Sequence, residues 1–288
     1  MNDRPYYSVR SGRNNGKLDL TLEELKDMFF ATYQDFERKY YFQEAFGYEC
    51  VDAGFVPGIA GNNVSAYFFR KLRKRNIWPI RDNIDNYSEE DLFDLIEILY
   101  DLISFPDPEK GYYHEWNDCG WHYQTFIKEK GQNEYKTEIN SVIANYENGY
   151  ELSSEGEILE IIETGFEELF ETETLVFDPE NIDGRIRIAI HKFRKYQSTE
   201  QDKKEAVREL ADVLEYLKRG GFDMRLLSKD ENDLFNIANN YAIRHHTPNQ
   251  KNGYDKPIWL KWIFYAYLAS INLLIELEHK KRESADSN

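Results

Sequence analysis

Arg244, His245 and His246 lie next to one another near the C-terminal end of a predicted helix, and Asn240 precedes them by one turn. Cleavage of RNA without a metal requires a base for the 2′-hydroxyl, an acid for the leaving 5′-oxygen and a cation for the developing charge. A histidine can take either proton role near neutral pH, and an arginine fork suits phosphate geometry. The same residues at a helix end could instead bind phosphate only, or bond the free carbonyls of the last turn.

The helix that carries these residues is predicted from its apolar spacing. Leu234, Ile237, Ala238, Tyr241 and Ala242 form one stripe at intervals of three and four residues. Ser228 and Glu231 have the spacing of a capping box, which predicts the start of the helix. Pro248 ends it, because the residue before a proline is excluded from the helical region.

The segments 237–246 and 259–269 together resemble the C-terminal half of a HEPN domain, of the kind found in AbiJ-like abortive-infection proteins. The resemblance implies a helical bundle, a homodimer, and RNA binding or metal-independent RNA cleavage in a defence or toxin-like role, with no cofactor. In this hypothesis Arg244 steadies the phosphate, His245 or His246 moves protons, and Asn240 orients one imidazole. The alternative is a catalytically silent binding or regulatory module, or a dimeric scaffold.

A second basic cluster lies at the end of a helix predicted from Asn62 or Asn63 to about Asn76. It consists of Arg70, Lys71, Arg73, Lys74 and Arg75, with aromatic residues close by in sequence. Such a cluster is typical of a phosphate-contacting surface for RNA or DNA. Cations on the last turn of a solvated helix, favoured by the helix dipole, are the alternative. A further ring of basic residues spans 185–195 and could flank Arg244.

An aromatic, irregular stretch contains His114, Cys119 and His122, which are potential metal ligands, with Asp118 or Cys50 as a fourth. Their spacing matches no zinc-finger pattern, and one cysteine alone is local. The sequence therefore favours packing and hydrogen bonding within an aromatic loop, and we assign no metal to the chain.

Composition narrows the classes of protein that remain. The chain has 288 residues, a hydrophobic content of 41% and a formal net charge of −17, which argue for a sizeable core and against a general nucleic-acid-coating protein. Two cysteines and a polar N-terminus predict a cytoplasmic protein without a secretory signal. The apolar run 258–275 has the length of a membrane span, but we interpret it as a buried bundle helix and expect no membrane association.

We expect a mostly helical, all-α protein. Residues 1–17 form a flexible arm, 18–177 an N-terminal helical domain with an irregular or hairpin insert at 105–150, and 178–288 a HEPN-like antiparallel bundle. Capping-box spacings predict helix starts at the following pairs: Thr21 and Glu24, Ser154 and Glu157, Ser198 and Gln201. Ser88 opens another helix, and the second pair opens an acidic helix over 157–173. A short strand or hairpin is expected just before that helix.

Overall fold

The computed structural model describes residues 4, 6–13, 18–147, 149–162, 166, 169–170, 178–222 and 255–286. The chain forms two compact units, Met1–Ile161 and Ile162–Asn288. The division between them precedes the turn at 178–184, at which the sequence suggested a domain boundary. The described residues are predominantly helical, as expected, but they also include four two-stranded antiparallel sheets.

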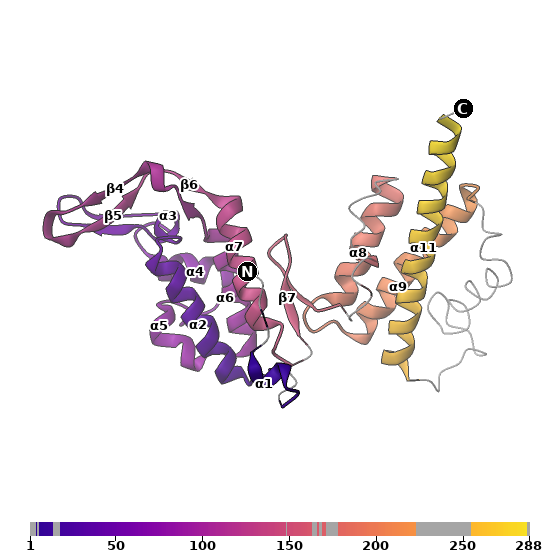
Figure 1. The fold of residues 1–288 in the computed structure, drawn as a ribbon, viewed down its shortest axis with the longest axis horizontal. Helices are drawn as coiled ribbons and strands as arrows, with labels where there is room; N and C mark the ends of the chain where they lie inside the picture. Colours follow the sequence, from indigo (N-terminus) through magenta and orange to yellow (C-terminus); the bar gives the residue numbers. More distant parts are fainter. Residues whose placement is uncertain are drawn as a thin grey trace. The chain divides into compact units, whose positions relative to one another are not determined.

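Three long helices form the core of the first unit: α2 (Leu22–Arg38), α6 (Glu89–Leu102) and α7 (Lys128–Ile143) (Figure 1). The predicted caps at the start of α2 and α6 are confirmed, because Thr21 and Ser88 each close a capping box. Shorter helices complete the unit: α1 (Tyr7–Arg10), α3 (Gln43–Phe46), α4 (Val64–Leu72), α5 (Ile80–Asn83), and the 3-10 turns η1 (Ile84–Asn86), η2 (Pro108–Lys110) and η3 (Trp116–Asp118).

Helix α7 corrects the expectation that residues 105–150 are an irregular insert. Its core side is formed by Tyr135, Ile139, Val142 and Ile143, which are buried between charged and polar residues. This stripe has helical spacing but occupies only the second half of the helix, and the apolar Ile127 occupies the N-cap, so neither apolar residues nor a capping residue mark its start. Tertiary packing against α2 and α6 stabilises it instead.

The strands of the first unit pair as antiparallel two-stranded sheets. They are β1 (Tyr48–Cys50) with β2 (Gly54–Val56), β3 (Phe105–Pro106) with β6 (Phe126–Ile127), β4 (Gly111–His114) with β5 (Gly120–Tyr123), and β7 (Tyr150–Leu152) with β8 (Ile158–Glu160). The last pair confirms a hairpin before residue 158. It also shows that the predicted acidic helix over 157–173 is wrong at its start, because Gly156 turns the chain and Ile158 pairs with Leu152.

The second unit contains α8 (Gly184–Arg194), α9 (Glu200–Arg219) and α11 (Lys256–Asp286), preceded by the π-helical turn η6 (Pro179–Asp183). Helices α8 and α11 both pack against α9 (Figure 1). Helix α9 begins one residue later than expected: Thr199 and Asp202 form the capping box, not Ser198 and Gln201. The predicted helix from Ser228 to about residue 247 lies outside the described residues.

Helix α11 is the one helix in the described part of the chain that is long and apolar enough to cross a membrane. Its buried side packs into the core of the second unit through Ile263, Phe264 and Leu268, which are fully buried. Phe193 of α8 stacks on Phe264 with ring centroids 4.0 Å apart. Trp262 remains exposed, so the described residues cover one side of α11 and do not surround it as the sequence led us to expect.

Candidate functional site

The predicted catalytic residues Asn240, Arg244, His245 and His246 all lie outside the described residues. The basic ring over 185–195 lies on α8 and just after it, and three of its cations contact α9. Lys195 Nζ lies 2.8 Å from an Asp202 carboxylate oxygen, and Arg185 and Lys192 form ion pairs with carboxylates of the same helix. These ion pairs link α8, and the residue that follows it, to α9.

The basic cluster of the first unit lies at the C-terminal end of α4. Of the two predicted caps, Asn62 and Asn63, it is Asn63 that caps the helix, by accepting a hydrogen bond from the Ala66 N–H at 2.9 Å. Arg73 ends it in the left-handed conformation at φ 60°, so α4 stops at Leu72 and not near Asn76 as predicted. Four cations of the cluster are exposed on and just after the last turn: Arg70, Lys71, Arg73 and Arg75.

Lys74 differs from the other members of this cluster, because it is half-buried and holds α4 against α6. Its Nζ lies 3.0 Å from Asp91 Oδ1 and 2.7 Å from Asp94 Oδ2. Burial opposes the charged form, but the hydrogen bonds to Asp94 and Asp91 prevail and raise the pKa of Lys74. Lys74 therefore fixes the position of the basic helix end, and the four exposed cations are left to face solvent.

Aromatic side chains accompany these cations. The guanidinium of Arg75 lies 5.3 Å from the ring centroid of Phe69, which is 42% exposed. Lys71 approaches Tyr67 in the same way. Phe68 is buried beneath them and stacks on Trp78. The end of α4 thus combines cations suited to phosphate with an exposed ring on which a base can stack.

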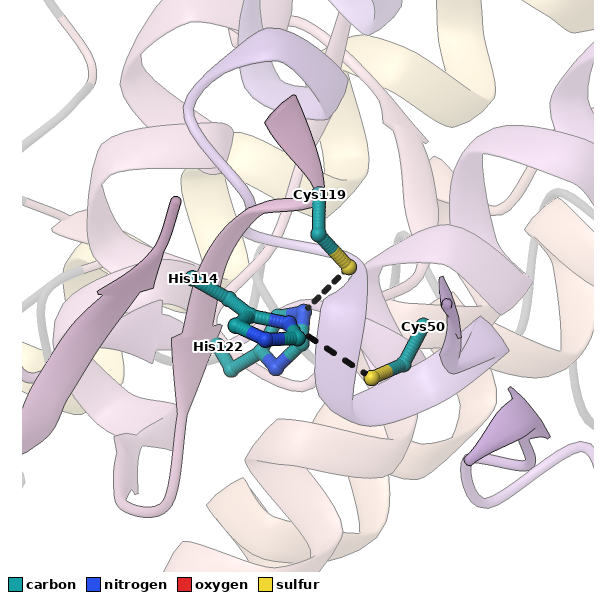
Figure 2. A group of neighbouring side chains, drawn as sticks. All are labelled: Cys50, His114, Cys119 and His122. Carbon is teal, nitrogen blue, oxygen red and sulfur yellow. Dashed lines mark hydrogen bonds between the residues drawn. The ribbon is translucent and has the colours of Figure 1, made fainter. Parts of the chain in front are cut away.

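A second cluster of chemically active side chains joins two hairpins of the same unit. Cys50 is the last residue of β1, His114 is the last residue of β4, and Cys119 and His122 lie just before and within β5. Each residue offers one ligand atom, and these four atoms lie within 4.8 Å of one another. Figure 2 shows both thiols directed toward the two imidazoles.

The two imidazole rings are oriented by hydrogen bonds as well as by the thiols. Cys50 Sγ lies 3.7 Å from His114 Nδ1, and Cys119 Sγ lies 3.3 Å from His122 Nε2. The remaining nitrogen of His122 is 3.1 Å from the hydroxyl of Tyr112. His122 is buried, and loss of hydration together with the nearby His114 lowers its pKa, which favours the neutral imidazole.

The structure thus assembles three residues that the sequence analysis considered as ligands and selects Cys50 as the fourth member. Asp118 is held elsewhere, where it accepts a hydrogen bond from the Tyr113 hydroxyl. The sequence interpretation of this stretch as aromatic loop packing did not foresee the convergence. The signal that could have indicated it was the presence of both cysteines of the chain in the same half as two of its histidines.

Comparisons of the chain with protein-family models, with curated proteins and with solved structures find no match.

Proposed function

We propose that the protein binds RNA through the exposed basic end of α4 and that its C-terminal half acts as a metal-independent ribonuclease of HEPN type. The observation that carries the binding proposal is the set of four exposed cations within six residues beside an exposed phenylalanine. The chain as a whole has a formal net charge of −17, so a polyanion is repelled elsewhere and attraction is confined to such local surfaces.

The ion pairs of Lys74 support this proposal, because they hold the helix end in one position before a ligand arrives. A surface that is already ordered loses less conformational entropy on binding. The exposed ring of Phe69, with Arg75 beside it, also supports RNA binding. An aromatic ring can stack on any base without regard to sequence. We therefore expect single-stranded RNA, with little sequence preference, to be the ligand of this surface.

The cleavage proposal depends on the chemistry of Arg244, His245 and His246 and on the family resemblance. In it the guanidinium of Arg244 holds the scissile phosphate, and an imidazole of His245 or His246 transfers the protons. Asn240 orients one of the two rings. A dimer would bring two such sets of side chains together across a two-fold axis.

Binding is tested by fluorescence anisotropy with a labelled single-stranded RNA at several salt concentrations. Four phosphate contacts predict that log K falls against log salt with a slope of about −3. The variant Arg70→Gln, Lys71→Gln, Arg73→Asn, Arg75→Gln should abolish most binding; asparagine at position 73 suits its left-handed conformation. The matched control removes four exposed cations elsewhere: Arg38, Lys39, Lys110 and Lys218, each changed to Gln. Equal loss in both variants would refute a site on α4.

Cleavage is tested with total RNA, using the wild-type protein and the double variant Arg244→Ala, His246→Ala. Activity that persists in EDTA and disappears in the variant supports metal-independent chemistry. A parallel reaction in divalent-free buffer without chelator shows whether EDTA acts through the Cys–His cluster. Equal inactivity of both proteins, with RNA binding intact, would refute cleavage and leave a silent RNA-binding module.

A further inference from the structure

We propose that Cys50, His114, Cys119 and His122 bind one Zn²⁺ in a tetrahedral, structural site that joins the β1–β2 hairpin to the β4–β5 hairpin (Figure 2). The site is independent of the proposed RNA binding and cleavage. It uses two thiols and two imidazoles, a ligand set that zinc commonly takes in structural sites.

The distances within the cluster fit such an ion. In a tetrahedral site with Zn–S near 2.3 Å and Zn–N near 2.0 to 2.1 Å, a sulfur and a nitrogen are separated by about 3.6 Å. Two of the four sulfur–nitrogen pairs of the cluster, Cys50 with His114 and Cys119 with His122, lie at 3.7 Å and 3.3 Å. The largest separation among the four ligand atoms, 4.8 Å at most, exceeds the ideal by about 1 Å, which side-chain rotation can remove.

The second nitrogen of each imidazole is held by an oxygen, as in most zinc sites. His114 directs Nδ1 toward Cys50, and its Nε2 lies 3.3 Å from Asp52 Oδ2. With a metal on Nδ1, the Nε2–H donates to that carboxylate. His122 directs Nε2 toward Cys119 and its Nδ1 toward the Tyr112 hydroxyl. The Asp52 carboxylate can only accept, so it favours the His114 tautomer whose Nδ1 lone pair faces Cys50. The Tyr112 hydroxyl can accept a hydrogen bond from Nδ1–H of His122, and in that tautomer the Nε2 lone pair faces Cys119.

Packing alone does not explain this arrangement. Thiols are weak hydrogen-bond donors, and a buried imidazole needs no more than two partners. Four nitrogen and sulfur atoms from two hairpins converge here, and the contact of the Cys119 thiol with the Glu49 carbonyl at 3.5 Å does not account for the two imidazoles. This soft ligand set selects zinc over magnesium or calcium, and four protein ligands leave no open coordination position for catalysis.

A metal would also stabilise these hairpins, because two-stranded hairpins are marginally stable by themselves. Several of their large side chains are exposed, namely Phe55, Tyr112, Tyr113 and Trp121. One protein contact anchors β5 to α3: Gln43 donates to the Trp121 carbonyl and accepts from the Tyr123 N–H, both at 2.8 Å. A zinc ion would link the end of β1, through Cys50, to β5 and the residue before it, through His122 and Cys119.

The test is the metal content of the full chain, purified under reducing conditions and measured by elemental analysis. We expect one zinc per chain, released by a mercurial thiol reagent. Reconstitution with Co²⁺ should give the visible absorption of a tetrahedral site with thiolate ligands. Cys50→Ser and Cys119→Ser should each weaken zinc binding roughly a hundredfold or more.

Two variants serve as matched controls. Asp118→Asn alters the neighbour of Cys119, and His191→Gln removes a histidine of the second unit; both should retain one zinc. The Co²⁺ spectrum of the wild-type chain tests the site even if a cysteine variant fails to fold. A wild-type chain that takes up neither Zn²⁺ nor Co²⁺ with its thiols reduced, or an octahedral cobalt spectrum, would overturn the proposal.

Discussion

Tyr112 is the side chain that fixes the orientation of the His122 imidazole, through a contact of 3.1 Å between its hydroxyl and Nδ1. Tyr112→Phe removes this partner and leaves all four proposed ligands in place. We expect zinc affinity to fall by about tenfold, the usual effect of losing such an outer partner. Competition with a chromophoric chelator measures the change. Tyr113→Phe is the control, because that hydroxyl contacts Asp118 instead, and an equal effect of both variants would contradict the role given to Tyr112.

Glu97 carries a carboxyl whose ionised form is disfavoured in the fold. Burial raises its pKa, the hydrogen bond from the Ile158 N–H at 2.8 Å offsets part of this, and Asp94 adds to the rise. A carboxyl with a raised pKa stabilises the fold below its ordinary pKa of about 4.3, and this contribution is lost as pH rises through the raised value.

Glu97→Gln keeps an acceptor for Ile158 and removes the charge. We therefore expect a gain on the order of 1 kcal/mol in the free energy of unfolding at neutral pH, vanishing near pH 4. Urea unfolding at both pH values measures it. Glu90→Gln, on the exposed face of the same helix, should change little. A gain that is equal at both pH values would show that burial of the charge is not its cause.

At the scale of single residues, the sequence identified the residue types that can bind a metal but could not decide which residue is the fourth member of the cluster. His114, Cys119 and His122 were candidates because they are close in the chain. The choice between Cys50 and Asp118 was open, since Cys50 is separated from His114 by 64 positions and reaches it through the fold alone. A local spacing rule cannot detect a ligand that a second hairpin supplies.

Helix α7 approaches the chain before β3 closely at Gly131. A Cβ built there would lie 2.6 Å from the Phe105 nitrogen and 2.7 Å from Ser104 backbone atoms. Gly131→Ala gains about 1 kcal/mol of helix propensity, but the backbone contact must open. We expect a net loss of about 1 to 3 kcal/mol, seen as a lower urea midpoint. Asn133→Ala, exposed on the same helix, should leave the midpoint unchanged or raise it; a gain for Gly131→Ala would disprove the close packing.

At the scale of elements, the sequence predicted helices best where a cap and a dense apolar stripe coincide. Thr21 and Ser88 satisfy both conditions, and their helices begin as expected. Helix α7 has neither, so its existence follows from burial of Tyr135 and Ile139 against other helices. Residues 158–160 have apolar residues that fit a helix or a strand, and the turn at Gly156 decides for the strand.

At the scale of the whole molecule, the apolar spacings predicted a mostly helical chain and the turn at 178–184 suggested two domains, while the structure has two compact units. The units divide after Ile161, whereas the sequence suggested the turn at 178–184 because that turn is richer in turn residues than the segment near Ile161. Turn residues mark any change of direction, whereas a domain boundary is a minimum of contacts between segments that are distant in sequence.

Each unit has its own hydrophobic core, which leads to a prediction about unfolding. Ile139 is fully buried in the first unit and Leu268 in the second. Changing either to Ala costs about 2 to 5 kcal/mol. We expect calorimetry to show two transitions, one lowered by Ile139→Ala and the other by Leu268→Ala. A high-affinity zinc chelator should lower the unfolding temperature of the first unit alone, because all four proposed ligands belong to that unit. If the chelator also shifts the unfolding temperature of the second unit, the inference that each unit unfolds with its own core is contradicted.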